Sequence, residues 1–247
     1  GAGFDLAQPS PAAPNRGMTV EEVTEAGAPL RFEHAQDRLR IHLARPGTRG
    51  ELREVVVRYR GVPATGLLVA PNKHGDRTFF SDTWPNKARQ WLPVVDHPYD
   101  KATAEFRVTA PAHYQVVSNG LLAEETALGD GRRLSCWRQS VPIASWLYVL
   151  GVARFAVEHR PAWKGLPVET WVFPQDRDQG FEAFAEPTVA ALDFFSTRVG
   201  PYSYERLANV QANGLKGGME AATSILYGDD SVSGAQRRWD TVIVHEI

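Results

Sequence analysis

From residue 18 to about residue 159, short segments in which apolar and polar residues alternate are separated by turn residues. Side chains of a strand point to its two faces in turn, so this period of two predicts half-buried antiparallel strands. The clearest of these segments are 39–43, 54–59, 105–109 and 114–118, with a further strand-like run over 146–155. Asn119-Gly120 follows one of them and favours a tight hairpin turn. We therefore expect a mainly β domain over residues 1–159, built as an antiparallel saddle or sandwich.

After residue 160 the pattern changes to a mixture of strands and helices. Residues 166–173 and 207–211 predict strands, and 223–227 predicts an edge strand. Apolar residues at helical spacing between Phe181 and Phe195 predict a helix, in which Pro187 would cause a kink or mark a late start. Residues 239–247 predict the first turns of a buried helix. We expect an α+β domain that begins at residue 160.

Composition excludes several classes of protein. Apolar residues make up 43% of the chain and charged residues 23%, which rules out wholesale disorder. The net charge of -2 leaves no basic field for general binding of nucleic acid. The single cysteine, Cys136, cannot form an internal disulfide bond or a thiolate metal site. No apolar segment approaches the roughly 20 residues that would span a bilayer.

The two ends of the sequence suggest a piece of a longer protein. The chain starts with Gly-Ala-Gly and stops within the apolar run Thr-Val-Ile-Val-His-Glu-Ile. A domain that ended inside a buried helix would leave backbone groups without partners. We therefore expect a fragment, whose β domain could begin with strands before residue 1. Compartment and oligomeric state are not given by the sequence.

Two short motifs could carry chemistry. His245-Glu246 lies near the start of the last predicted helix, as in a zinc-protease helix, where a second histidine follows four residues after the first. In Gly217-Gly218-Met219-Glu220, two glycines allow a close approach of backbone to a ligand, and the carboxylate could meet a cation. Taken singly, each motif has a simpler explanation: a satisfied His-Glu pair, and a turn before an edge strand.

The order of these motifs resembles that of the aminopeptidase N-type zinc metallopeptidases, the gluzincin aminopeptidase family. The resemblance extends from about residue 18 to residue 247 and includes several further motifs upstream. These are Lys87-Ala88-Arg89, Pro93, Asp96-His97-Pro98, Lys101-Ala102-Thr103, Val117-Ser118-Asn119-Gly120, the strand near residues 148–155 and Gly200-Pro201-Tyr202.

This resemblance implies an N-terminal β domain followed by the start of a thermolysin-like α+β catalytic domain that ends inside the zinc helix. It implies a hydrolase that removes N-terminal residues from peptides with a free N-terminus, using water activated by one zinc ion. His245 would be the first of three zinc ligands, and Glu246 the general base. Glu220 would bind the free α-amino group of the substrate. Gly217, Gly218 and Met219 would lie along the substrate backbone.

The sequence departs from the family pattern at positions that would contact substrate. Ala221 stands where the family usually has Asn, which removes a side-chain hydrogen bond near the substrate carbonyl. Asp82 and Trp84 stand where many members have Gln and Glu, and Asp82 could still meet the amino terminus of the substrate. His97 replaces a Glu at a position that we expect to be structural.

Three interpretations remain open at this point. The parent could be a zinc aminopeptidase, a non-catalytic binding or scaffold module that retains the fold, or a hydrolase of a non-peptide substrate such as an epoxide. A single imidazole does not hold a catalytic zinc ion with useful affinity. We therefore expect the 247-residue chain alone to be inactive, with zinc absent or weakly bound.

Overall fold

The computed structural model describes residues 1–233 and 236–247, which fold into two compact units. The first unit consists of Gly1–Leu67, Asp82–Lys101 and Ala144–Trp146. The second consists of Leu68–Ser81, Ala102–Ile143 and Leu147–Ile247. Chain segments that are far apart in the sequence therefore contribute to each unit. The predicted domain boundary between residues 159 and 160 stays a prediction.

The first unit is built from two three-stranded antiparallel sheets. Their strand orders are β1-β5-β4 and β3-β2-β6. Val23, Leu39 and Ile41 are buried together and form its small core. The strands are β1 (Ala2–Asp5), β2 (Gly17–Glu25), β3 (Ala28–Pro29), β4 (Arg31–Ala35), β5 (Arg38–His42) and β6 (Val55–Val62).

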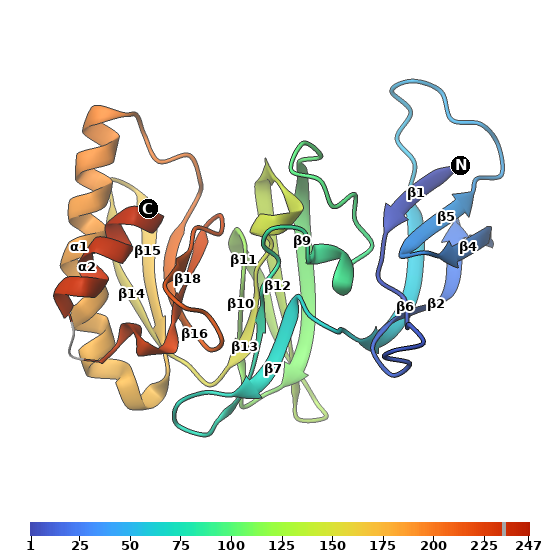
Figure 1. Ribbon diagram of the computed structural model, residues 1–247. Helices are drawn as coiled ribbons and strands as arrows, with labels where there is room; N and C mark the ends of the chain where they lie inside the picture. Colours follow the sequence, from blue (N-terminus) through green and yellow to red (C-terminus); the bar gives the residue numbers. More distant parts are fainter. Residues whose placement is uncertain (234–235) are drawn as a thin grey trace. The chain divides into compact units, whose positions relative to one another are not determined.

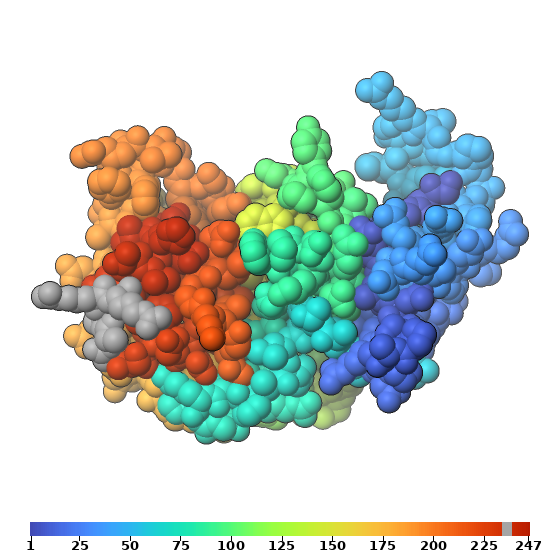
Figure 2. Space-filling model, in the orientation of Figure 1, coloured from blue at the N-terminus to red at the C-terminus, as the bar shows by residue number. Residues whose placement is uncertain are grey.

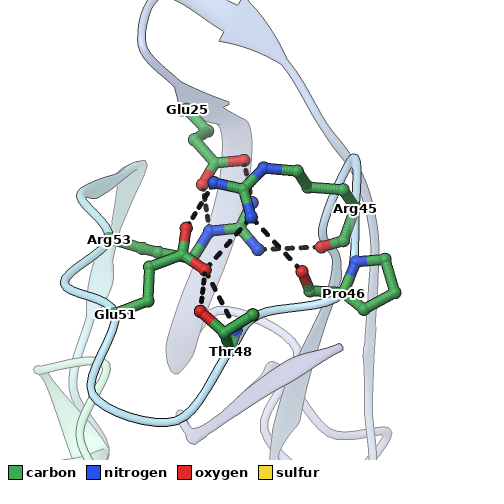
Figure 3. Close-up of polar contacts among 6 residues, drawn as sticks. All are labelled: Glu25, Arg45, Pro46, Thr48, Glu51 and Arg53. Carbon is green, nitrogen blue, oxygen red and sulfur yellow. Dashed lines mark hydrogen bonds and ion pairs between the residues drawn. The ribbon is translucent and has the colours of Figure 1, made fainter.

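The long loop between β5 and β6 is held by a cluster of charged side chains (Figure 3). Arg53 donates to both carboxylate oxygens of Glu25 on β2, at 2.6 and 2.7 Å, and to the carbonyl of Arg45 at 2.8 Å. Glu51 pairs with Arg45 and accepts the backbone N–H of Thr48 at 3.0 Å. These bonds lower the pKa of Glu51 from its ordinary value of 4.5 to about 2, with the hydrogen bond from Arg45 as the largest cause. The loop is thus ordered by polar contacts.

Two β-sheets of the second unit enclose its larger core. Their strand orders are β10-β13-β8-β7 and β11-β12-β9. Buried aromatic residues fill the core, among them Phe80, Trp137 and Phe155. The strands are β7 (Leu67–Pro71), β8 (Arg77–Ser81), β9 (Ala102–Pro111), β10 (Gln115–Ser118), β11 (Leu121–Leu128), β12 (Arg132–Ile143) and β13 (Leu150–Ala153).

The third sheet of the second unit is mixed and carries the two α-helices on one face (Figure 1). Its order is β14-β15-β16-β18-β17, with parallel pairing of β15 with β16 and of β16 with β18. Phe184 of α1 and Trp239 and Ile243 of α2 are buried against the sheet residue Tyr227. The elements are β14 (Ala156–Trp163), β15 (Leu166–Val172), α1 (Arg177–Arg198), β16 (Leu207–Ala212), β17 (Gly218–Met219), β18 (Ser224–Gly228) and α2 (Gln236–Glu246).

Neither of the described α-helices is both long and apolar enough to cross a bilayer. Four short 3-10 turns complete the described elements. The 3-10 turns are η1 (Ala88–Gln90), η2 (Ser145–Leu147), η3 (Pro174–Asp176) and η4 (Asp229–Ser231).

Most predicted elements are confirmed, with three corrections. The segment expected at a sheet edge, β18, is an interior strand, because the two-residue strand β17 pairs along its other side. The run over 146–155 is a strand only from Leu150 to Ala153, after the 3-10 turn η2. Helix α1 begins at Arg177 and continues through Pro187, so the late start is wrong.

Candidate functional site

The Gly-Gly-Met-Glu motif forms the outer edge of the mixed sheet. Gly218 and Met219 make up β17, which pairs with β18 so that Gly218 lies opposite Tyr227. Gly217 has a φ of +88°, a left-handed conformation that favours glycine. Its carbonyl accepts the N–H of Gly228 at 2.9 Å. The sequence thus places a tight turn and a short edge strand directly before Glu220.

Helix α2 brings Glu246 against this edge. A Cβ atom added at Gly218 would lie 2.5 Å from Cδ of Glu246 and would overlap the rest of its carboxylate. A larger residue at this position would force the Glu246 side chain to move. In the space-filling view, the red surface of the C-terminal residues adjoins the orange-red surface of the segment before them (Figure 2). The two sequence motifs, about 25 residues apart, therefore meet in space.

The charges at this edge are of the same sign. Burial raises the pKa of Glu246, the nearby negative charge of Glu220 raises it further, and His245 partly opposes the shift. Glu220 itself is exposed, whereas the neighbouring Ala221 is buried. Burial also raises the pKa of Tyr227, to which the charge of Glu246 adds. The site therefore contains two carboxylates: the half-buried Glu246 at the end of α2, and the exposed Glu220 directly after β17.

His245 points to a different environment. It is exposed and lines a cavity of about 480 Å³ together with Phe195, Tyr202 and Tyr204. Among residues 1–233 and 236–247 no three His, Cys, Asp or Glu side chains are grouped so that they could hold a metal ion. One imidazole does not make a zinc site, so the described residues do not by themselves fit the metal that the resemblance implies.

Asp82, the remaining predicted substrate contact, belongs to the first unit. Its carboxylate forms an ion pair with Lys87, and its backbone N–H donates to the carbonyl of Gly66 at 2.9 Å. The side chain is 39% exposed. Its role toward an amino terminus stays a prediction.

The upstream motif around Arg89 and Asp96 is a structural clasp within the first unit. Asp96, with a side chain 1% exposed, accepts the Nε–H of Arg89 at 3.1 Å and the hydroxyl of Ser145 at 2.7 Å. Its backbone N–H donates to the Asp5 carboxylate at 3.0 Å, and Arg89 lies 3.7 Å from the same carboxylate. These charges are satisfied by one another, so the motif stabilises the fold. His97 is exposed beside it.

The sequence did not indicate the residues that hold the other end of the Gly-Gly-Met-Glu segment. Asn119 and Gly120 were expected only to turn a hairpin, yet they bond to Ala222 and Thr223, about 100 residues further along. Thr223 has a φ of +65°. The Asn-Gly dipeptide signals the turn, but no local pattern signals what the turn contacts.

Comparisons with known proteins agree with this architecture. A family model described as Peptidase M1 N-terminal domain matches residues 18–147. Human glutamyl aminopeptidase is 29% identical over 177 residues, which cover 68% of this chain and 18% of the human protein. Leucine aminopeptidase 2 of Neurospora crassa is 28% identical over 224 residues, which cover 84% of this chain and 32% of the relative.

A solved structure shares the fold of nearly the whole chain. The crystal structure of the M1 zinc metallopeptidase from Deinococcus radiodurans matches with a TM-score of 0.80 at 22% identity, over 99% of this chain and 55% of that one. The chain thus spans well under two thirds of the proteins that it matches. The match over residues 18–147 and the sheets found there show that this chain belongs to the Peptidase M1 N-terminal domain family.

Proposed function

We propose that this chain is part of a zinc-dependent aminopeptidase that removes N-terminal residues from peptides. One observation carries the proposal: the Glu246 carboxylate packs directly against Gly218 at a sheet edge, with the Glu220 carboxylate close enough to raise its pKa. A structural role alone would not favour a second negative charge near the half-buried Glu246, because a like charge disfavours its ionised form. Binding of a peptide amino terminus would explain Glu220, and proton transfer at the first peptide bond would explain Glu246.

The described residues divide the task among them. In the described sheet order β17 is the last strand, so a peptide backbone could pair along its outer side as an added strand. The exposed carboxylate of Glu220 would bind the positively charged α-amino group, and this contact would restrict cleavage to the first residue. Glu246 would accept a proton from a water molecule beside the first peptide carbonyl. Ala221 would leave the substrate carbonyl without a side-chain donor at this position.

The zinc ion of the proposal requires more than this chain. His245 would supply one ligand, and the remaining ligands would have to come from residues outside those described. The purified 247-residue chain should therefore contain far less than one zinc per molecule after dialysis. Metal analysis that found one zinc per chain would contradict this.

Activity is tested on the natural protein that contains this chain. We expect hydrolysis of aminoacyl 4-nitroanilides and no hydrolysis of their N-acetylated forms. Glu246→Gln should lower kcat by about 10²-fold or more, and Glu220→Gln should mainly raise KM. The control is Glu182→Gln, an exposed carboxylate on α1, which should change neither value. An inactive wild-type protein would favour the scaffold interpretation, and a fully active Glu246→Gln variant would contradict the role of Glu246 as general base.

A further inference from the structure

The hairpin turn between β10 and β11 is bonded to the segment that follows Glu220. The amide nitrogen of Asn119 donates to the carbonyl of Ala222 at 2.6 Å. The backbone N–H of Gly120 donates to the hydroxyl of Thr223, also at 2.6 Å. We call this set of four residues, Asn119, Gly120, Ala222 and Thr223, the clip. Asn119 and Thr223 are both 0% exposed, so neither can exchange these bonds for water.

The clip holds the backbone in a conformation that the residue would otherwise avoid. Thr223 has a φ of +65°, and a β-branched residue rarely adopts a left-handed conformation. Its hydroxyl accepts the N–H of Gly120 and donates to the carbonyl of Ala222 at 2.6 Å. Backbone strain of this kind persists only where the surroundings impose it, and it is concentrated at functional sites. At Thr223 this restraint comes from the hydrogen bond between its hydroxyl and Gly120, in a turn about 100 residues earlier in the sequence.

Neighbouring bonds strengthen the connection. The hydroxyl of Ser224 donates to the carbonyl of Ser118 at 2.8 Å. The buried Arg206 donates to the same carbonyl at 2.7 Å and to the hydroxyl of Ser224. Within the clip, the side-chain oxygen of Asn119 accepts the N–H of Val149 at 2.6 Å. The turn at Asn119-Gly120 is therefore held by these bonds as well as by its bonds to Ala222 and Thr223.

The segment that carries Glu220 is thus short and is held at both ends. At one end the carbonyl of Gly217 is bonded to Gly228, and at the other the clip holds Ala222 and Thr223. Between these anchors, the N–H of Ala221 bonds only within the segment, to Met219 at 2.7 Å. Gly218 and Met219 are also held by their pairing with β18, so Glu220 and Ala221 are the residues of the segment whose path depends most on the clip.

We propose that Asn119 and Thr223 are positioning residues for the substrate-binding edge: their bonds keep the backbone after Glu220 strained and thereby set where its carboxylate meets the α-amino group of a peptide. The substrate in this statement rests on the proposed function, whereas the restraint on the segment does not.

The first test separates positioning from stability by kinetics of the natural protein. Thr223→Val keeps the shape and removes the hydroxyl, and should raise KM for an alanyl 4-nitroanilide about tenfold with kcat changed less than about twofold. Thr223→Ser keeps the hydroxyl and should restore the wild-type KM. The control is Thr188→Val, which removes an equally buried hydroxyl bonded to Asn209 at 2.9 Å and should leave KM unchanged. An unchanged KM in Thr223→Val, or an equal rise in Thr188→Val, would overturn the proposal.

The second test uses the 247-residue chain and needs no activity. Thr223→Gly removes the hydroxyl but accepts the positive φ, so this variant should fold even if Thr223→Val does not. We expect amide hydrogen exchange over residues 219–224 to become about tenfold faster in Thr223→Gly and to stay unchanged in Thr188→Val. Unchanged exchange in Thr223→Gly would show that the Thr223 hydroxyl does not restrain this segment, and would overturn the proposal. A wild-type protein without aminopeptidase activity but with this exchange pattern would overturn only the proposed function.

Discussion

Two charged clusters of this chain carry motifs of the same family but differ in how their charges are arranged. In the first unit, Asp96 and Asp5 lie on either side of Arg89, and each carboxylate faces a donor. In the second unit, the negative charge of Glu220 raises the pKa of Glu246, and both residues adjoin β17, the last strand in the described order of the mixed sheet. The first arrangement is complete without a ligand. In the second, the charge of Glu220 and burial both disfavour the ionised form of Glu246.

This difference fits the proposal that the first cluster maintains the fold and that the second serves the proposed activity. A buried charge that is hydrogen-bonded on all sides contributes to stability when it is kept intact. Groups whose neighbours shift their pKa without satisfying them are concentrated at functional sites. We therefore expect changes in the first cluster to affect mainly the free energy of unfolding, and changes in the second to affect mainly activity.

The largest effect on stability is expected from Asp96→Ala. It leaves Arg89 with the more distant Asp5 and removes the acceptor of the Ser145 hydroxyl, and should lower the free energy of unfolding by about 3 kcal/mol. Urea denaturation of the 247-residue chain measures it. The control is Asp82→Ala, which removes a more exposed pair with Lys87 and should cost less than about 1 kcal/mol. An equal loss of unfolding free energy in the two variants would show that the buried Arg89–Asp96 contacts stabilise the fold no more than the exposed pair does.

Gly218→Ala tests the second cluster and should show the opposite pattern. The new Cβ would displace the Glu246 side chain, which can rotate away, so the free energy of unfolding should change by less than about 1 kcal/mol. Activity of the natural protein should fall by about a hundredfold, because a catalytic group moved by about 1 Å loses that much. A crystal structure of the variant should show the carboxylate displaced.

A double-variant comparison completes this test. If Gly218 matters only through Glu246, then Gly218→Ala should have no further effect on activity in a Glu246→Ala background. A further loss in that background would mean that Gly218 contributes through its backbone, by pairing with the peptide.

The sequence predicted well whatever depends on local periodicity. The period of two located β5, β6, β9 and β10, and the helical spacing located α1 despite Pro187. It could not predict that β18 is interior, because the strand that covers it, β17, has only two residues and no periodicity to detect. The placement of a strand within a sheet depends on partners that no local pattern specifies.

The same limit applies to the site. Glycines beside a carboxylate and a His-Glu pair on a helix are local signals, and the sequence singled out Gly218, Glu220, His245 and Glu246. The contact between Gly218 and Glu246 is not local, and neither is the clip between Asn119 and Thr223. A threonine at positive φ has no sequence signature at all, because propensity alone would place glycine or asparagine there.

The smallest expected effect concerns a third arrangement, charges that are paired but close to solvent, in the β5–β6 loop. The pKa of Glu51 is lowered from 4.5 to about 2, chiefly by Arg45, so the folded state favours the ionised carboxylate. Its contribution is therefore present above pH 4.5 and is lost as the pH falls toward 2. Glu51→Gln should lower Tm slightly at pH 6, and the difference from wild type should vanish near pH 2. Arg49→Gln, a neutralised charge in the same loop, serves as the control. A Tm difference that stayed constant between pH 6 and pH 2 would show that ionisation of Glu51 does not stabilise the loop.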